Sequence, residues 1–281
     1  ALMAPTPNSG KPSVERETAN SAVYNANQCP GMLAAVMAAD KAVQLAGEDG
    51  NAVALVSSYN TSTSSGQLAF YVERMARQGF IGIALANSPE FVAAAAGGKT
   101  VFGTNPMAVG IPQAGTGYPF TFDMATSAIA LFGVLSAKAK GEPLPTNVAY
   151  DAKGNWTTDA STALDGGAIA TFGGHKGAGL ALCIEILAGA LSGAAVLGQV
   201  PSKKEAKSWG HTMIAIRPEA FVDDFEGKAA SIISTVKASG DGIRIPGERS
   251  ALTAQERTAA GVMPIPTKIW ESIVYTSQNG L

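Results

Sequence analysis

Apolar and polar positions alternate along the 281-residue chain in a way that predicts helices interspersed with short strands. Helical spacing of apolar residues, in several places ended by glycine, predicts helices at 33–46, 68–78, 128–140, 180–191, 221–238 and 267–277. Short apolar runs predict strands at 52–56, 80–86, 107–111, 120–122 and 211–216, and 148–151 and 156–158 flank a predicted turn. Because the elements do not alternate strictly and hairpin-like turns join strands, we expect an α/β (α+β) fold with a mainly antiparallel or mixed sheet wrapped by helices.

Composition adds an expectation about assembly. Hydrophobic residues make up 46% of the chain and charged residues only 15%, against about 25% in typical proteins. This balance argues against disorder and indicates surface that is covered in an oligomer, so we expect a homodimer. Lys+Arg 20 against Asp+Glu 22 gives a net charge of −2. We therefore expect no nucleic-acid partner and no association with an anionic membrane.

Cysteine use and the chain's opening segment bear on location. Cys29 and Cys183 have no second thiol nearby in the sequence, and we expect both to be buried thiols in a reducing compartment. Residues 4–10 have a loop-like composition without the pattern of a signal or transit peptide. The apolar run 180–191 is interrupted by Glu185 and is shorter than the roughly 20 residues of a membrane span. We expect a cytoplasmic protein with one compact domain over 1–281.

The usual nucleotide and metal signatures fail. The GxGxxG candidate that begins at Gly177 has Leu182 where the third glycine belongs, and the Gly-Lys-Thr at 98–100 lacks the first glycine of a P-loop. His175 and His211, the only histidines, lie far apart with no HExxH motif or cysteine pair, so we expect no metal site. The sequence also lacks the GxSxG motif of serine hydrolases.

Three polar clusters remain, at 102–106 with 122–127, at 172–179 and at 245–249. In the first, small hydroxyls and backbone amides beside apolar strands can contact phosphate or amide groups. In the second, glycines open directly into a predicted helix, whose N-terminus favours an anion, and Lys176 adds a positive charge there. Each cluster is also compatible with a structural role. Asp123 can cap the following helix, and Lys176 can be a solvated lysine, although a lysine is unfavourable at an empty helix N-terminus.

In order and spacing, the clusters resemble the malate/L-lactate dehydrogenase family of the non-Rossmann type. That family includes ureidoglycolate dehydrogenase, diketogulonate reductase, sulfolactate dehydrogenase and the piperideine-2-carboxylate (ketimine) reductases. The likeness runs from about Gly10 to Gly247 and is carried by the motifs at 11–18, 103–106, 123–127, 173–177 and 246–248.

The resemblance implies an NAD(P)-dependent oxidoreductase that transfers a hydride between nicotinamide and C2 of a small 2-hydroxy or 2-oxo acid, in a homodimer with a non-Rossmann nicotinamide-binding fold. It implies a cofactor-binding part at about 100–250 and substrate contacts at Ser62, Ser64, Asn87 and His211. NAD and NADP are not distinguished, since the chain has no Rossmann acidic residue to contact the ribose. The implied cofactor contacts are Gln67, Thr104, Asn105, Phe122, Asp123, Met124, Ala125, Thr126, His175, Lys176, Pro246, Gly247 and Glu248.

The chain departs from the family pattern at the proton donor. The family's N-terminal helical segment carries a Ser-His-Gly motif with the donor histidine, and residues 1–8 supply none, so we expect that the sequence is truncated. Ser64 stands where a second family histidine occurs, and a hydroxyl is a poor general acid. His211 is the remaining candidate donor. We therefore expect the 281-residue chain to bind cofactor but to reduce 2-oxo acids slowly.

Two alternatives stay open. The first is reduction of a cyclic imine by the same kind of site, because a protonated imine needs less help from a general acid than a ketone does. The second is a catalytically silent protein that binds the cofactor or only dimerises.

Overall fold

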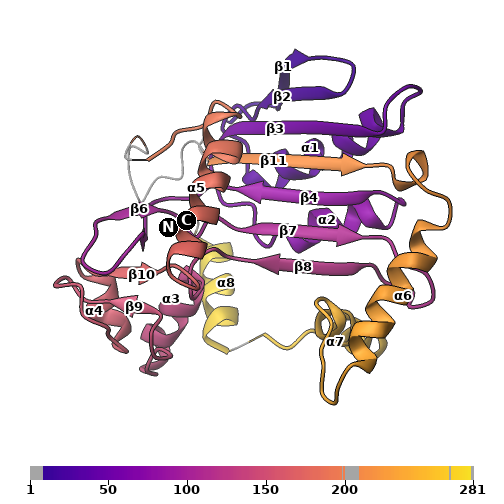
Figure 1. The fold of residues 1–281 in the computed structure, drawn as a ribbon. Helices are drawn as coiled ribbons and strands as arrows, with labels where there is room; N and C mark the ends of the chain where they lie inside the picture. The colour runs from indigo at the N-terminus through magenta and orange to yellow at the C-terminus, as the bar shows by residue number, and fades with distance from the viewer. Residues whose placement is uncertain (1–8, 198, 200–208, 266, 280–281) are drawn as a thin grey trace.

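A seven-stranded sheet is the largest element of the computed structural model, which describes residues 9–197, 199, 209–265 and 267–279 (Figure 1). All neighbouring strands are antiparallel except the parallel pair β2 and β3. This confirms the predicted mixed, mainly antiparallel sheet. In spatial order the strands are β1 (Ser13–Glu17), β2 (Ser21–Asn25), β3 (Val53–Thr61), β11 (Trp209–Ile216), β4 (Ile81–Ala86), β7 (Met107–Ile111) and β8 (Phe120–Met124).

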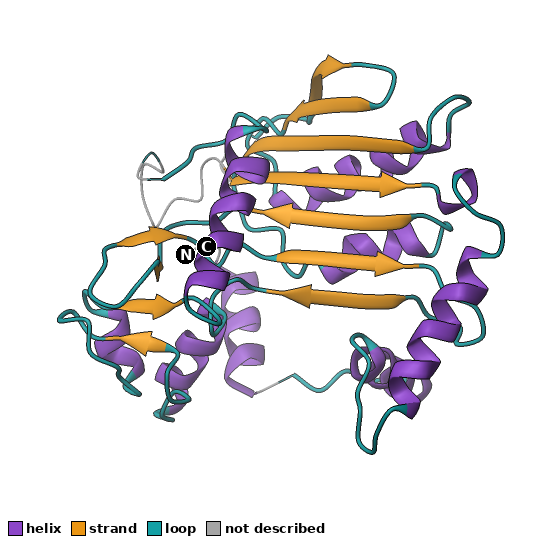
Figure 2. Cartoon of the chain, viewed as in Figure 1, coloured by secondary structure: helices purple, strands orange, loops and turns teal. Residues whose placement is uncertain are grey.

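A smaller four-stranded sheet lies beside one end of the large sheet (Figure 2). Its central strands β5 and β10 are parallel, and each has an antiparallel neighbour on its outer side. In spatial order it contains β6 (Thr100–Phe102), β5 (Val92–Ala93), β10 (Ala168–Ala170) and β9 (Ala149–Tyr150).

Helices cover both faces of the large sheet. On one face, α1 (Gly31–Gly47) packs on β3 and β11 through buried alanines, and α2 (Ala69–Ala76) packs on β4 and β7. On the other face, α5 (His175–Ile184) continues into the π-helical segment η1 (Glu185–Ala190), which contacts β4 and β11 (Figure 1). The other helices are α3 (Leu131–Lys140), α4 (Ala160–Leu164), η2 (Pro218–Ala220), α6 (Phe225–Ala238), α7 (Glu248–Ala260) and α8 (Thr267–Asn279).

Several elements differ from the expectation in ways that have physical causes. The sequence of β1 is largely polar and all five of its residues are exposed, so no apolar run marks it. Strands β5 and β10 are only two and three residues long, too short to show a period. Helix α7 buries none of its residues and its sequence is largely polar, so no apolar stripe marks it and it was not predicted. The strand predicted at 52–56 extends to Thr61 because polar residues continue the ladder with β11.

The two cysteines do not share one environment. Cys29 is buried, as expected, whereas Cys183 is exposed on the outer side of α5. The expectation of two buried thiols is therefore wrong for Cys183, because Cys183 and Leu182 lie on the outward-facing side of the helix while Ala181 and Ile184 face the core. None of the helices in the described residues combines the length and the apolar character needed to cross a bilayer.

Candidate functional site

The candidate site lies at the edge of the large sheet where several of its strands begin or end. Strands β3, β4 and β8 end there, and β7 and β11 begin there, because neighbouring strands in this part of the sheet run in opposite directions (Figure 2). The segments that leave these strand ends are far apart in the sequence. The sheet therefore gathers the residues around 62–67, 87–89, 104–106, 125–127 and 209 at one edge.

A cavity of about 370 Å³ lies at this edge. Four of the predicted site residues line it: Ser64 and Asn87 from the substrate set, and Gln67 and Thr104 from the cofactor set. The structure thus brings together residues that the sequence separates by up to 40 positions.

The walls of this cavity are mostly apolar. The small sheet contributes Phe91, the start of α3 contributes Leu131 and Phe132, and the start of β11 contributes Trp209. Pockets of this kind, apolar with a few convergent polar groups, are typical of sites for small ligands. The aromatic residues were missed in the sequence because nothing distinguishes them from core side chains before the fold is known.

Thr126 joins two of the polar clusters. Its backbone N–H and its hydroxyl both donate to the carbonyl of Thr104, at 2.9 and 3.1 Å, and the hydroxyl also reaches the carbonyl of Asn105 at 3.1 Å. The backbone N–H of Phe172 donates to the Thr126 carbonyl at 3.0 Å. The segments 104–105, 122–127 and 172–176 therefore form one connected surface beside the cavity.

Lys176 lies in the first turn of α5, next to this surface. Gly173 and Gly174 precede the helix with φ values of 56° and 60°, a left-handed backbone that favours glycine. His175 and Lys176 are both exposed, and the first turn contains no acidic residue. An exposed helix N-terminus with an added cation suits a phosphate group.

Asp123 caps a helix, but not the one expected. Its Oδ2 accepts the backbone N–H of Ala69 at 2.8 Å, at the start of α2, whereas α3 begins at Ala130 without a side-chain cap. The alternative reading, in which Asp123 caps the following helix, does not hold, because on β8 its side chain reaches the N-terminus of α2 instead. Desolvation raises the pKa of the Asp123 carboxyl, and the N–H groups of Ala69 and Leu68 oppose that rise.

The third cluster lies at the other end of β8. Gly247 has φ 89°, and a Cβ added there would lie 3.1 Å from the backbone N of Thr121, near the start of this strand. Glu248 accepts hydrogen bonds from the Lys237 ammonium and, at 3.3 Å, from the Ile245 N–H, and Lys237 lowers the pKa of its carboxyl. The structure does not bring 246–248 to the cavity, but β8 leads from them to Met124 and Ala125 at the edge.

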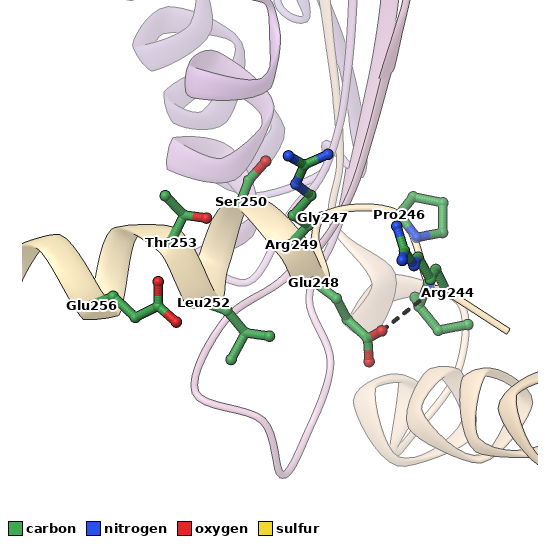
Figure 3. A pocket seen from close by; sticks show the side chains of 10 residues that line it. Arg244, Pro246, Gly247, Glu248, Arg249, Ser250, Leu252, Thr253 and Glu256 are labelled. Carbon is green, nitrogen blue, oxygen red and sulfur yellow. Dashed lines mark hydrogen bonds between the residues drawn. The ribbon is translucent and has the colours of Figure 1, made fainter. Parts of the chain in front are cut away.

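An open cavity of about 860 Å³ accompanies this cluster and is lined by residues 244–256 (Figure 3). Glu248 turns back toward the segment before α7, while Arg249 points to the opposite side of the helix (Figure 3). The arrangement presents polar groups of both signs along the side of the molecule where β8 starts.

Ser62 and His211 are buried and lie outside the cavity lining. The Nδ1 of His211 is 3.2 Å from the Ser58 hydroxyl, and burial lowers the pKa of His211 to about 4. His211 is therefore neutral near pH 7 and cannot act there as an imidazolium acid. Within the described residues, neither His211 Nε2 nor Ser62 Oγ has a hydrogen-bond partner.

Glu185 is a site residue that sequence reasoning did not identify. Its buried carboxylate accepts from the side-chain amides of Asn87 at 3.2 Å and Asn105 at 2.8 Å, one residue from each predicted set. In the sequence Glu185 only interrupts an apolar run. A single charged residue within a long apolar run is the signal that could have identified it, because the run predicts burial. Glutamate is rarely buried unless other groups pair with it.

These residues fit a nicotinamide dinucleotide. Lys176 and the start of α5 offer a phosphate contact, and the cavity next to Thr104 has room for a flat ring. The buried Oδ1 of Asn105 has no hydrogen-bond partner in the described part of the chain and lies beside the same surface. Residues 122–126 lie at the end of β8, and residues 246–248 lie beside its start. Contacts at both ends of one strand suit an extended ligand.

Comparisons with known proteins agree with this geometry. A family model described as malate/L-lactate dehydrogenase matches residues 5–274. The L-sulfolactate dehydrogenase of Methanothermobacter thermautotrophicus is 38% identical over 270 residues, which cover 94% of this chain and 77% of that protein. A Delta(1)-pyrroline-2-carboxylate reductase of Burkholderia multivorans is 38% identical over 216 residues, covering 72% and 61%. The crystal structure of malate dehydrogenase from Entamoeba histolytica superposes with a TM-score of 0.89 at 27% identity, covering 100% of this chain and 82% of that one.

Proposed function

The chain belongs to the malate/L-lactate dehydrogenase family, and we propose that it transfers a hydride between NAD(P)H and C2 of a small 2-oxo acid to give the 2-hydroxy acid. The observation that supports this most strongly is the connection through Thr126 of a mostly apolar cavity to a glycine-rich helix start that carries Lys176. The connection provides one place for a reacting ring and another for a phosphate, side by side.

The chain's own residues bind and orient in this proposal. When bound, the nicotinamide supplies or accepts the hydride. Lys176, in the first turn of α5, holds a phosphate, and the backbone around Thr104 and Thr126 supports the ring. Ser64 orients the substrate oxygen, Asn87 shapes the cavity wall beside it, and the apolar walls exclude water, which strengthens polar contacts inside.

A cyclic imine is the second candidate substrate, and the cavity walls favour it. Phe91, Leu131, Phe132 and Trp209 suit the methylene groups of a ring more than a second anionic group. A protonated imine also carries its own proton to the reaction. Ser64 is a poor acid and His211 is neutral, so this substrate suits the described groups better than a ketone does.

Steady-state oxidation of NADH and NADPH separates these candidates. The substrates to compare are pyruvate, oxaloacetate and a cyclic ketimine such as Δ1-piperideine-2-carboxylate. We expect measurable oxidation with at least one of them, and the highest kcat/KM for the ketimine if the apolar walls set the preference. Cofactor binding without oxidation in the presence of any of the three would support a catalytically silent protein instead.

We also propose that the protein is a homodimer that associates through the outer face of α5 and η1. Leu182, Ile186, Leu187 and Leu191 lie along this face with exposed fractions of 42–53%, an unusual apolar stripe for a monomer.

The two unpaired cysteines support the expected cytoplasmic location.

Light scattering at micromolar protein should give a mass of twice 28.5 kDa. Ile186→Glu places a charge in the stripe and should shift the protein toward monomer. The matched control Ile232→Glu changes a somewhat more exposed isoleucine on α6, at 65% against 53% for Ile186, and should leave the mass unchanged. A wild-type mass near 28.5 kDa would contradict the dimer.

A further inference from the structure

Glu185 is a buried carboxylate without a cationic partner among the described ion pairs. It is 5% exposed and begins η1, where the α5 helix widens into a π-helical turn. Such widened turns occur often at functional sites. Burial raises the pKa of Glu185, while the amides of Asn105 and Asn87 and the backbone N–H of Leu197 favour the charged form. A buried carboxylate that is satisfied only by neutral donors is a costly feature, which calls for a role.

The two amides that contact Glu185 belong to different strand ends of the cavity. Asn87 follows β4 and lines the cavity itself. Asn105 precedes β7, and its neighbours Thr104 and Pro106 line the cavity. Asn105 also has φ 34°, a left-handed conformation that asparagine tolerates better than most residues. A single carboxylate therefore connects both segments.

The carboxylate also fixes which way each amide points. A carboxylate only accepts hydrogen bonds, so the NH₂ group of each asparagine must face it. Each NH₂ group is completed by a backbone carbonyl, that of Ala195 for Asn87 at 3.0 Å and that of Ala181 for Asn105 at 3.1 Å. The Oδ1 of Asn87 is thereby turned to the Gly210 N–H at 2.8 Å, directly beside Trp209 in the cavity wall.

We propose that Glu185 is a positioning residue, which holds the amides of Asn87 and Asn105 in one orientation and so sets the shape of the substrate cavity. The proposal rests on the proposed oxidoreductase function for its kinetic consequence, but its structural consequence at Trp209 does not depend on turnover. Glu185 acts through the asparagines and has no direct contact with substrate in this role.

Glu185→Gln tests this positioning role, called the clamp below, with little change in the shape of the side chain. The carboxamide keeps one acceptor and replaces the other with an NH₂ group, so one asparagine meets a donor where it had an acceptor. We expect the KM for the 2-oxo acid or the cyclic imine to rise about 10-fold, the scale of one hydrogen bond to a charged group. The Kd of NAD(P)H should rise less than the KM, because Lys176 keeps its phosphate contact and Asn105 is only one of several proposed cofactor contacts. Glu142→Gln, at an exposed glutamate after α3, is the matched control and should change neither value.

A second readout needs no enzymatic activity. The chain has three tryptophans, Trp156, Trp209 and Trp270, so replacing the first and last by phenylalanine leaves Trp209 as the only indole. In this background Glu185→Gln should make Trp209 fluorescence more sensitive to acrylamide. The reason is that Asn87 Oδ1 is no longer held in the position where it accepts the Gly210 N–H, next to Trp209.

A double variant checks the direct contact. Asn87→Asp alone places two carboxylates together and should affect KM and quenching more than Glu185→Gln does. Adding Glu185→Gln to Asn87→Asp restores a donor opposite an acceptor, so the double variant should approach wild-type quenching and KM more closely than Asn87→Asp alone.

The outcomes separate the two proposals. If the wild type oxidises no NAD(P)H with any substrate, the proposed function fails, and the Trp209 response still decides the role of Glu185. Wild-type quenching in Glu185→Gln, or a double variant no better than Asn87→Asp, would overturn the clamp. A parallel loss of cofactor affinity, substrate affinity and melting temperature would also overturn it, because that pattern indicates general destabilisation.

Discussion

Lys176→Ala is expected to weaken NAD(P)H binding by about 1.5–3 kcal/mol, or roughly 10- to 150-fold in Kd, the usual scale for a contact between a charged group and a phosphate. The reason is the place of Lys176. It lies in the first turn of α5, behind two glycines with left-handed backbone, where the helix dipole disfavours a cation unless an anion binds. Fluorescence titration of NADH and NADPH measures the change directly.

Lys153→Ala is the matched control for this experiment. Lys153 is also exposed, but it lies in the turn at 151–154, away from the three polar clusters. Its removal should leave the Kd unchanged, whereas the melting temperature should be similar for both variants. Unchanged affinity in Lys176→Ala would remove Lys176 from the cofactor site.

Gly110→Ala is expected to lower the free energy of unfolding by about 1–3 kcal/mol, the usual cost of forcing extra volume into a packed core. Gly110 lies on β7 under α2, and a Cβ added there would lie 2.6 Å from the carbonyl carbon of Val72. Backbone cannot yield as a flexible side-chain end can, so α2 must move away from the sheet. Thermal unfolding should show a decrease of roughly 3–10 °C for a chain of this size.

Gly179→Ala provides the opposite result. Gly179 lies inside α5, and an added Cβ meets nothing within 4 Å. Alanine there should be neutral or raise the unfolding free energy by about 0.5–1 kcal/mol, because glycine is the weaker helix former. Equal melting temperatures for Gly110→Ala and wild type would show that α2 is not held as closely to β7 as the structure indicates.

The sequence predicted the long apolar or amphipathic elements, the exposed helix α6 among them, better than the short or polar ones. Strand β7 and the helix at α1 follow from runs of apolar residues, which one-sided burial requires. Strand β1 and helix α7 carry no such run because their sequences are largely polar, and neither element was predicted. Periodicity reports burial, so elements that are held mainly by hydrogen bonds leave little trace in it.

The candidate site was predictable as a set of motifs but not as an arrangement. Glycines, small hydroxyls and Lys176 marked the clusters, yet only the fold shows that Thr126 connects two of them while Gly247 lies at the other end of β8. The cap formed by Asp123 was assigned to the wrong helix because α2 is distant in sequence. Glu185 was missed since its partners, Asn87 and Asn105, lie 98 and 80 positions away, next to the ends of other strands.

Hydride transfer from nicotinamide to C2 is the central claim, and isotope transfer tests it most directly. The protein is incubated with NADH or NADPH carrying deuterium at both C4 positions of the nicotinamide, together with pyruvate or the cyclic ketimine, long enough for slow turnover to accumulate product. Mass spectrometry of the product should show one deuterium at C2. The amount of labelled product should decrease strongly in Lys176→Ala at limiting cofactor. Product without deuterium at C2, or no product with either cofactor and any of the substrates, would contradict the account.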